Sequence, residues 1–321
     1  MTRYIARRLG ASVVLLAVVS LLLFVVLRVL PGDPTMTLLG GVQGADEDAA
    51  NEIRKQLGLN DSLPSQYAQW VGGMLTGDFG QSYFSQTSVN TLVAQRIWPT
   101  VELTLVAMIM AVLIAFPLAL VAALRPNSMV DRTVGAFTTM TMAVPSFLIA
   151  IVLVVVFSVR LGALPTRGYV PLLDDPLGNL RVVLLPALTL ALTSAAPILR
   201  FLRTSLAEVS AAPYMRTARG KGLRWPKALV GHALPNALLP TLTVMGLIVG
   251  RLLGGVVVIE YIFGWPGLGT LIVDAVLKRD YAVLQTTVLF AAAAFIVSAL
   301  VVDVLYGVVD PRLRIRPKEA A

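Results

Sequence analysis

The stretch Tyr214–Pro240, YMRTARGKGLRWPKALVGHALPNALLP, lies between two segments that are apolar enough to cross a membrane. It carries a cluster of cations: Arg216, Arg219, Lys221, Arg224 and Lys227. Lys and Arg accumulate in short loops that stay on the cytoplasmic side of a membrane. The stretch therefore predicts a cytosolic loop, at about residues 206–232, that joins two membrane spans.

Proline and glycine divide this loop into helical pieces. Pro213 suits the first position of a helix, where its missing N–H is not needed, and Gly222 can end that helix in a left-handed cap. Pro226 offers a second helix start that runs into the next apolar segment. We expect a short helix across the base of the membrane domain, with Tyr214 and Met215 as apolar anchors for a partner.

The composition is that of a membrane protein. Hydrophobic residues make up 57% of the chain, charged residues only 14%, and the mean hydropathy is +0.80, which excludes an ordinary soluble protein. The formal charge of +8 lies in short loops and tails, so it indicates orientation in the lipid bilayer and not binding of nucleic acid. The chain has no cysteine, which excludes disulfides and thiolate metal sites.

We predict an all-α polytopic membrane protein with six transmembrane helices. The first apolar run, Leu9–Leu27, would span about 28 Å as a helix, close to the 30 Å of the bilayer core. A cleaved signal peptide is the alternative, but the run exceeds the usual length and no A-x-A site follows. The other predicted spans are Val101–Leu124, Thr133–Val159, Val182–Phe201, Ala233–Val258 and Tyr281–Leu305, with kinks expected at Pro117, Pro145, Pro186 and Pro240.

This topology places both termini in the cytosol, because each predicted inside segment is basic. The expected divisions are a cytosolic N-terminus (1–8), the first helix (9–30), an outer region (31–98), a core of five helices (99–306) and a cytosolic tail (307–321). In the outer region we expect amphipathic helices at Asp46–Leu57 and Pro64–Leu75. They indicate a folded docking surface for a partner protein outside the membrane, with a solvated connector as the alternative.

Four charged residues fall within or near the apolar runs. Arg28 and Glu102 lie close to the outer ends of their spans and are expected to extend to the membrane interface. Arg251 and Asp303 lie deeper, where a charge should face the bundle interior, a partner or water. Both are candidates for the translocation path. The alternative for Arg251 is a structural ion pair, and that for Asp303 is a basic partner or a backbone cap.

No catalytic constellation, metal site or cofactor site is predicted. The single histidine, His232, lies at the junction of loop and span without a companion. The pattern G-x-x-x-x-G-K-[ST] is absent, so ATP hydrolysis would belong to another chain. A proton-coupled secondary transporter would need paired intramembrane acids, and a closed scaffold would not need the basic loop.

The basic loop resembles the E-A-A-x3-G-x9-I-x-L-P pattern of the membrane subunits of bacterial ABC importers. The Gly of the pattern falls on Gly222, its second Ala on Ala218, and its Leu-Pro on Leu234 and Pro235, while Arg216 and His232 replace its Glu and Ile. The variant is similar to that of the dipeptide, oligopeptide and nickel permeases.

A second block, E-x-I-F-x-W-P-G-L-G at 260–269 followed by R-D-Y at 279–281, also resembles this family. Gly and Pro in it predict an external re-entrant turn that caps the bundle, carried by Glu260, Trp265, Pro266 and Gly267. Shorter matches occur at 31–34, 57–59, 77–82, 303–306 and 310–312, so the resemblance covers nearly the whole chain.

The resemblance implies a type I importer permease of the cytoplasmic (inner) membrane, without enzymatic activity of its own. It implies a second, homologous permease, a solute-binding protein and two ATPase subunits that hold ATP and Mg. The solute would be a peptide, with nickel or another small solute as the alternative. Coupling to the ATPase would involve Tyr214, Met215, Arg216, Thr217, Ala218, Arg219, Lys221, Gly222, Leu234 and Pro235.

Overall fold

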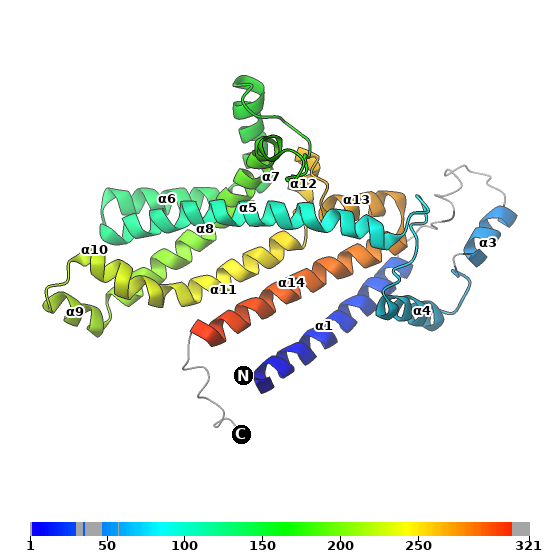
Figure 1. Ribbon diagram of the computed structural model, residues 1–321, viewed down its shortest axis with the longest axis horizontal. Helices are drawn as coiled ribbons and strands as arrows, with labels where there is room; N and C mark the ends of the chain where they lie inside the picture. Colours follow the sequence, from blue (N-terminus) through cyan, green and yellow to red (C-terminus); the bar gives the residue numbers. More distant parts are fainter. Residues whose placement is uncertain (1, 30–34, 36–46, 57, 310–321) are drawn as a thin grey trace.

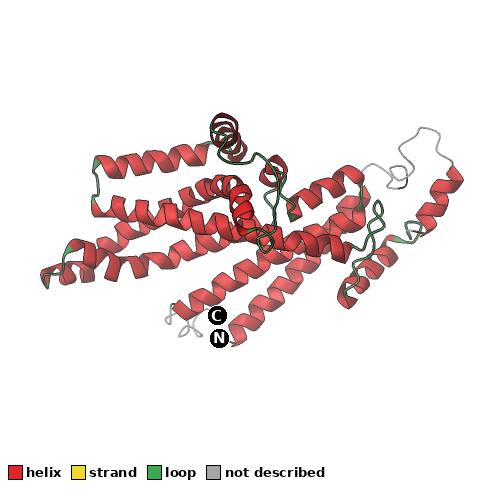
Figure 2. Ribbon diagram, turned by 45° about the horizontal axis from the view of Figure 1, so that its top comes forward, coloured by secondary structure: helices red, strands yellow, loops and turns green. Residues whose placement is uncertain are grey.

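The computed structural model describes residues 2–29, 35, 47–56 and 58–309. Within these residues the named elements are helices joined by turns and loops, as Figure 2 shows. The predicted Asp310–Arg312 match, the whole of the predicted 31–34 match and the basic tail lie outside the described residues.

The long helices run side by side along the molecule (Figure 1). They are α1 (Thr2–Val29), α5 (Val89–Leu124), α8 (Pro176–Ser210), α11 (Leu234–Leu253) and α14 (Tyr281–Val309). Helix α11 continues without interruption from α10 (Trp225–Ala228) and the π-helix η2 (Leu229–Ala233). In the described part of the chain five helices are long and apolar enough to cross a membrane, or up to seven when each of two bent pairs counts as a span. The predicted six-helix, all-α architecture agrees with this range.

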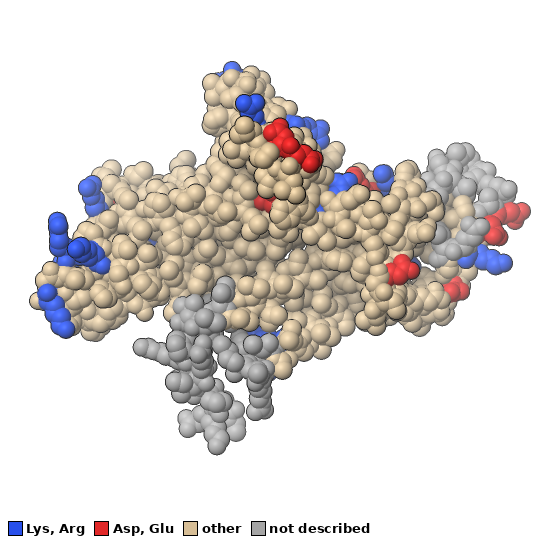
Figure 3. Space-filling model, in the orientation of Figure 1, with Lys and Arg blue, Asp and Glu red and all other residues tan. Residues whose placement is uncertain are grey.

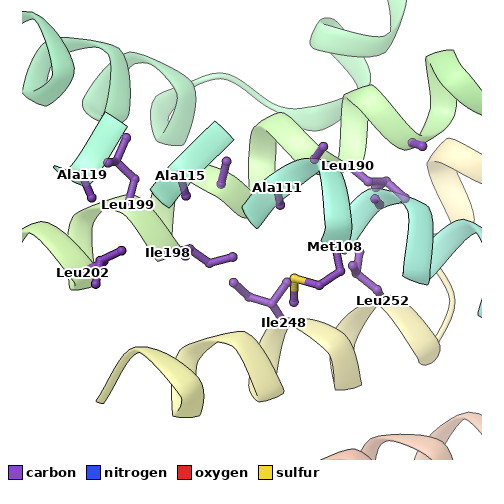
Figure 4. Packing of buried hydrophobic residues seen from close by; sticks show 14 of the residues in the cluster. Met108, Ala111, Ala115, Ala119, Leu190, Ile198, Leu199, Leu202, Ile248 and Leu252 are labelled. Carbon is purple, nitrogen blue, oxygen red and sulfur yellow. The ribbon is translucent and has the colours of Figure 1, made fainter. Parts of the chain in front are cut away.

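Helices α5 and α8 form the centre of the bundle (Figures 1 and 4). Alanines recur along α5 at every fourth residue and are fully buried, at Ala107, Ala111, Ala115 and Ala119. They meet the larger side chains Leu190, Ile198, Leu199 and Leu202 of α8 in one core cluster. Small residues on one helix let the two backbones approach closely, which drives helix packing where the solvent is itself apolar.

The predicted third span, Thr133–Val159, is not a single helix. Helix α6 (Met129–Ala143) ends at a bend of 103°, and α7 (Ser146–Leu153) with the π-helix η1 (Val154–Arg160) leaves in a new direction. The cause is Pro145, which lacks an N–H and moves the preceding residue to extended backbone, with Val144 at φ −88° and ψ 126°. The kink expected at Pro145 is therefore confirmed as a full break, whereas α5, α8 and α11 continue through Pro117, Pro186 and Pro240.

Helices α5 and α8 are longer than the predicted spans. Helix α5 begins at Val89, inside the region expected to be outer loop, and its 36 residues reach about 54 Å. That length exceeds the bilayer core of about 30 Å, so α5 extends beyond the apolar layer. Helix α8 begins early because Asp175 caps it, its Oδ1 accepting a 3.0 Å bond from the Gly178 N–H, with Pro176 at the first position.

The amphipathic helices expected in the outer region are present as α3 (Glu47–Gln56) and α4 (Leu63–Thr76). The apolar stripe of α4 packs on α1. Tyr67 and Trp70 lie with ring centroids 5.3 Å and 6.4 Å from that of Phe24, and the Tyr67 hydroxyl is 2.9 Å from Ser20 Oγ. The stripe thus serves internal packing, and a partner would meet other faces of α3 and α4.

Candidate functional site

The short helix expected in the basic loop is α9 (Pro213–Gly220), with Pro213 at its first position. It ends in a Schellman motif: Gly222 N–H donates to the Arg219 carbonyl (2.9 Å) and Leu223 N–H to the Ala218 carbonyl (3.2 Å). Gly222 has φ +85°, a left-handed conformation that glycine adopts without strain. The expected left-handed cap is confirmed.

Helices α9 and α10 form a corner at one end of the molecule (Figure 1). The Arg219 guanidinium lies 5.3 Å from the centroid of the Trp225 ring, which links the two helices by a cation–π contact. From Trp225 the chain runs through η2 into α11 as one apolar segment that ends at Leu253. One continuous helix thus leads from this corner into the bundle.

Most side chains of α9 are exposed, and Lys and Arg gather at this end of the molecule (Figure 3). Tyr214 is 44% exposed, whereas Met215 is fully buried in the main core cluster. The prediction that Met215 projects toward a partner is therefore wrong, because its side chain anchors α9 to the bundle. Among the other residues that the sequence analysis assigned to coupling, Ala218 and Leu234 are half-buried, and the exposed ones are Arg216, Thr217, Arg219, Lys221, Gly222 and Pro235.

His232 lies on an exposed turn of η2. Its backbone carbonyl accepts a 2.8 Å hydrogen bond from Asn236 Nδ2. Among the described residues there is no group of three or more His, Asp or Glu that could hold a metal ion.

The second motif forms a re-entrant corner, in which α12 (Val257–Phe263) and α13 (Leu268–Lys278) meet at 91°. Glu260 is buried, and its carboxylate caps the start of α13 by accepting the N–H groups of Gly269 and Thr270, the latter at 2.8 Å. A Cβ atom at Gly267 would lie 2.2 Å from Glu260 Oε1. The Glu260 carboxylate therefore reaches the start of α13 only because Gly267 has no side chain.

Trp265 joins this corner to α5. Its side chain is fully buried, its Nε1–H donates a 2.9 Å bond to the Pro99 carbonyl, and its ring meets Tyr169 edge to face at 4.8 Å. Pro266, beside it, is half-buried. The contacts of these residues are structural: they hold the corner against the main bundle.

Glu102 does not extend to the membrane interface as expected. It is 4% exposed, and its carboxylate accepts bonds from Asn179 Nδ2 (2.5 Å) and the Tyr169 hydroxyl (3.3 Å). Burial, together with the negative charge of Glu102, raises the pKa of Tyr169 to about 12, so the phenol stays a donor. No local sequence pattern marks this cluster, since Asn179 lies 77 residues from Glu102.

Arg28, at the end of α1, makes contacts within the chain. Its Nε and Nη2 donate to Gln66 Oε1 of α4, at 3.0 Å and 2.8 Å, and its guanidinium lies 4.8 Å from the Phe24 ring centroid. The side chain therefore ties α1 to α4.

The structure brings two of the sequence motifs together at Asp280. This buried carboxylate accepts bonds from Ser82 Oγ (2.5 Å) and the Tyr83 N–H (3.2 Å), which belong to the loop before α5. Asp280 also precedes α14 directly. That position, typical of a helix N-cap, is the signal by which the sequence could have marked it.

Arg251 lies exposed in the last turn of α11. Its neighbour Gly250 contacts α14, where an added Cβ would lie 2.4 Å from Ser298 Oγ. Asp303 belongs to α14, but its side chain lies outside the described residues, so its expected partner is not tested. A further ion pair, which the sequence did not suggest, joins α8 to α6 through Arg203 Nε and Asp131 Oδ1 at 2.6 Å.

Replacement of Glu260 by Ala should lower the thermal stability of the purified chain. It would leave the buried N–H groups of Gly269 and Thr270 without an acceptor, at a cost of about 1–3 kcal/mol and a midpoint lower by roughly 3 °C or more. Thermal unfolding followed by light scattering measures this. Glu208→Ala, on the exposed end of α8, is the control, and equal midpoints for the two variants would contradict the capping role.

Comparison with known proteins shows to which family this chain belongs. Residues 115–315 match the family described as "Binding-protein-dependent transport system inner membrane component", and residues 1–104 match the N-terminal family of the same systems. The chain is 40% identical to a putative peptide transport system permease protein of Brucella abortus, over 98% of this chain and 99% of that protein. It is 38% identical to the oligopeptide transport system permease protein AppB of Bacillus subtilis, with the same coverage.

Similarity also extends to the glutathione transport system permease protein GsiC of Escherichia coli K12, at 38% identity over 98% of this chain and 99% of that one. Among solved structures, a chain of the MetNI methionine ABC transporter in an inward-facing conformation superposes with a TM-score of 0.57. It covers 68% of this chain and 96% of that chain at 16% identity, which supports the fold alone. This chain therefore belongs to the family of binding-protein-dependent transport system inner membrane components.

Proposed function

We propose that this chain is the permease subunit through which peptides cross the cytoplasmic membrane, driven by ATP that separate subunits hydrolyse. The single observation that carries the coupling role is α9: a short exposed helix, rich in cations, whose Met215 is buried in the core of the bundle. The peptide class rests on the names of relatives that are 38–40% identical over nearly the full chain.

The coupling route follows from the contacts of α9. An ATPase subunit would bind the exposed face of α9, which carries Tyr214. ATP-driven closure of two such subunits would then shift α9. Met215 in the core and the Arg219–Trp225 contact would pass this shift to α10 and along η2 and α11. The bundle would then alternate between inward-open and outward-open states. ATP and Mg belong to the partner subunits.

The family to which the chain belongs supports further partners. A second, homologous permease would complete the pathway, and both termini would lie in the cytosol with the basic α9–α10 end. A solute-binding protein would dock at the opposite end, near α3 and α4, where acidic and basic side chains lie together in Figure 3.

The test is to co-express the chain with its partners, purify the assembled transporter and identify the co-purified solute by mass spectrometry. Uptake of labelled peptides and of a nickel chelate should then be measured in reconstituted vesicles that hold ATP on the side of the ATPase subunits. Peptide uptake that needs both ATP and the binding protein is the expected result. Uptake of nickel alone would contradict the peptide assignment, and uptake driven by a proton gradient without ATP would contradict the importer.

We further propose that Arg251, exposed near the end of α11, lines the translocation path and attracts the carboxylate of the solute. Arg251→Gln removes this charge, so uptake of a peptide with a free C-terminus should fall more than that of its amidated form. The measurement is initial uptake by the reconstituted transporter at several concentrations of each peptide. Equal losses for the two forms, with normal assembly, would exclude this role.

A further inference from the structure

A polar cavity lies where the outer halves of α1 and α14 meet α4 and the loop before α5. Its volume is about 250 Å³, and its lining includes Phe24, Arg28, Trp70, Tyr83 and Gln285. Three of these residues, each from a different helix, carry N–H groups. The cavity therefore gathers donors that belong to three separate elements of the fold.

These donors lack acceptors within the described part of the chain. Arg28 Nη1, Trp70 Nε1 and Gln285 Nε2 are each buried without a hydrogen-bond partner there. Burying an unpaired donor is costly, and native proteins seldom leave several together. A group with several acceptor oxygens would satisfy all three.

The lining of the cavity carries one cation, Arg28, and one carboxylate, Asp78. An arginine stays protonated, and Arg28 donates its other bonds to the neutral amide oxygen of Gln66. Asp78 also lines the cavity, but its Oδ1 accepts the Gly80 N–H at 2.9 Å, and no ion pair with Arg28 occurs among the described residues. Because Arg28 Nη1 is a buried charged donor without a partner in the described part of the chain, an anionic acceptor suits it best.

An apolar groove of about 650 Å³ begins on the other side of Arg28. It is lined by Leu21 and Val25 of α1 and by Leu63 and Tyr67 of α4, and it shares Phe24, Arg28 and Gln66 with the polar cavity. Leu21, Val25 and Leu63 are about half exposed, at 49%, 47% and 55%. Since α1 has the length and hydropathy of a membrane span, this groove opens toward the acyl chains of the bilayer.

We propose that an anionic phospholipid binds at this junction, with an acyl chain in the groove along α1. Its phosphate accepts from Arg28 Nη1, and from the Trp70 and Gln285 N–H groups in the cavity. The lipid would hold α4, and with it the outer helices, against the membrane bundle. This inference rests on α1 spanning the membrane and does not depend on the transported solute.

The test uses the assembled transporter in vesicles of phosphatidylcholine that contain increasing fractions of phosphatidylglycerol. Native mass spectrometry after extraction counts the phosphatidylglycerol that stays bound. Because a hydrogen bond to a charged group contributes strongly to binding free energy, Arg28→Gln should weaken retention of phosphatidylglycerol about tenfold or more. Arg160→Gln, an exposed arginine at the end of η1, is the matched control and should retain the lipid as the wild type does.

Two further variants distinguish loss of the lipid contact from misfolding caused by Arg28→Gln. Arg28→Lys keeps the charge and should retain most of the lipid, whereas Trp70→Phe keeps the ring but loses the N–H and should weaken retention several-fold. Equal retention in wild type, Arg28→Gln and Trp70→Phe would overturn the proposal, as would equal retention of phosphatidylcholine.

Competition separates a lipid from a free anion. Inorganic phosphate at millimolar concentration should not displace the bound phosphatidylglycerol, because it makes no contact in the groove. Displacement by inorganic phosphate would show a free-anion site and overturn the lipid assignment. These measurements need neither ATP nor a solute, so a wrong transport assignment would leave their outcome unchanged.

Discussion

Tyr214→Ala should separate ATP hydrolysis from transport while leaving the chain folded. Tyr214 is the large apolar side chain of α9 that is exposed, at 44%, whereas Met215 beside it is fully buried. A buried Tyr anchor at an interface is typically worth about 2 kcal/mol or more, so its loss should weaken docking of the ATPase about thirtyfold. Uptake into vesicles should fall accordingly, and ATP hydrolysis should lose its response to solute.

The matched control is Arg224→Ala, on the exposed turn that follows α9, which should change uptake by less than twofold. Size exclusion and thermal unfolding of the chain report whether folding is intact. Met215→Ala should behave differently, since it removes a core side chain and should lower the stability of the chain itself. Full uptake and normal ATPase control in Tyr214→Ala would show that force enters the bundle elsewhere.

Gly246→Leu should prevent assembly of a stable chain. Gly246 of α11 faces α14 so closely that an added Cβ would lie 1.9 Å from Val302 Cγ2. Leucine is a good helix former, so the cost comes from the forced separation of two packed helices, about 1–3 kcal/mol or more. In a membrane such contacts between small residues drive association. The yield of folded chain after extraction should fall severely.

The control is Gly10→Leu on α1, where no atom lies within 4 Å of the added Cβ, and where yield should be unchanged. A compensating pair of substitutions tests the contact between Gly246 and Val302 directly. Gly246→Ala alone should lower the unfolding temperature, and addition of Val302→Ala should restore part of the loss by removing the nearest methyl groups. Normal yield of Gly246→Leu would show that α11 and α14 do not pack in this way.

The sequence by itself determined the features that depend on neighbours a few residues away. Runs of apolar residues placed the membrane helices because crossing a bilayer requires length and hydropathy and little else. Pro213 and Gly222 marked the ends of α9, since the restricted φ of proline and the free φ of glycine are properties of single residues. Pro145 marked the break between α6 and α7 for the same reason.

The tertiary structure alone decided how the side chains are used. Met215 and Tyr214 are adjacent in the chain, yet the packing of α9 buries one and exposes the other. Glu102 meets Asn179, and Ser82 meets Asp280, across separations of 77 and 198 residues. A carboxylate near the end of an apolar run has the same local sequence whether it reaches water or a buried donor. Only the packing of the helices brings the donor within hydrogen-bond distance, and this is why the polar contacts that hold α1, α4, α5 and α14 together could not be read from the sequence.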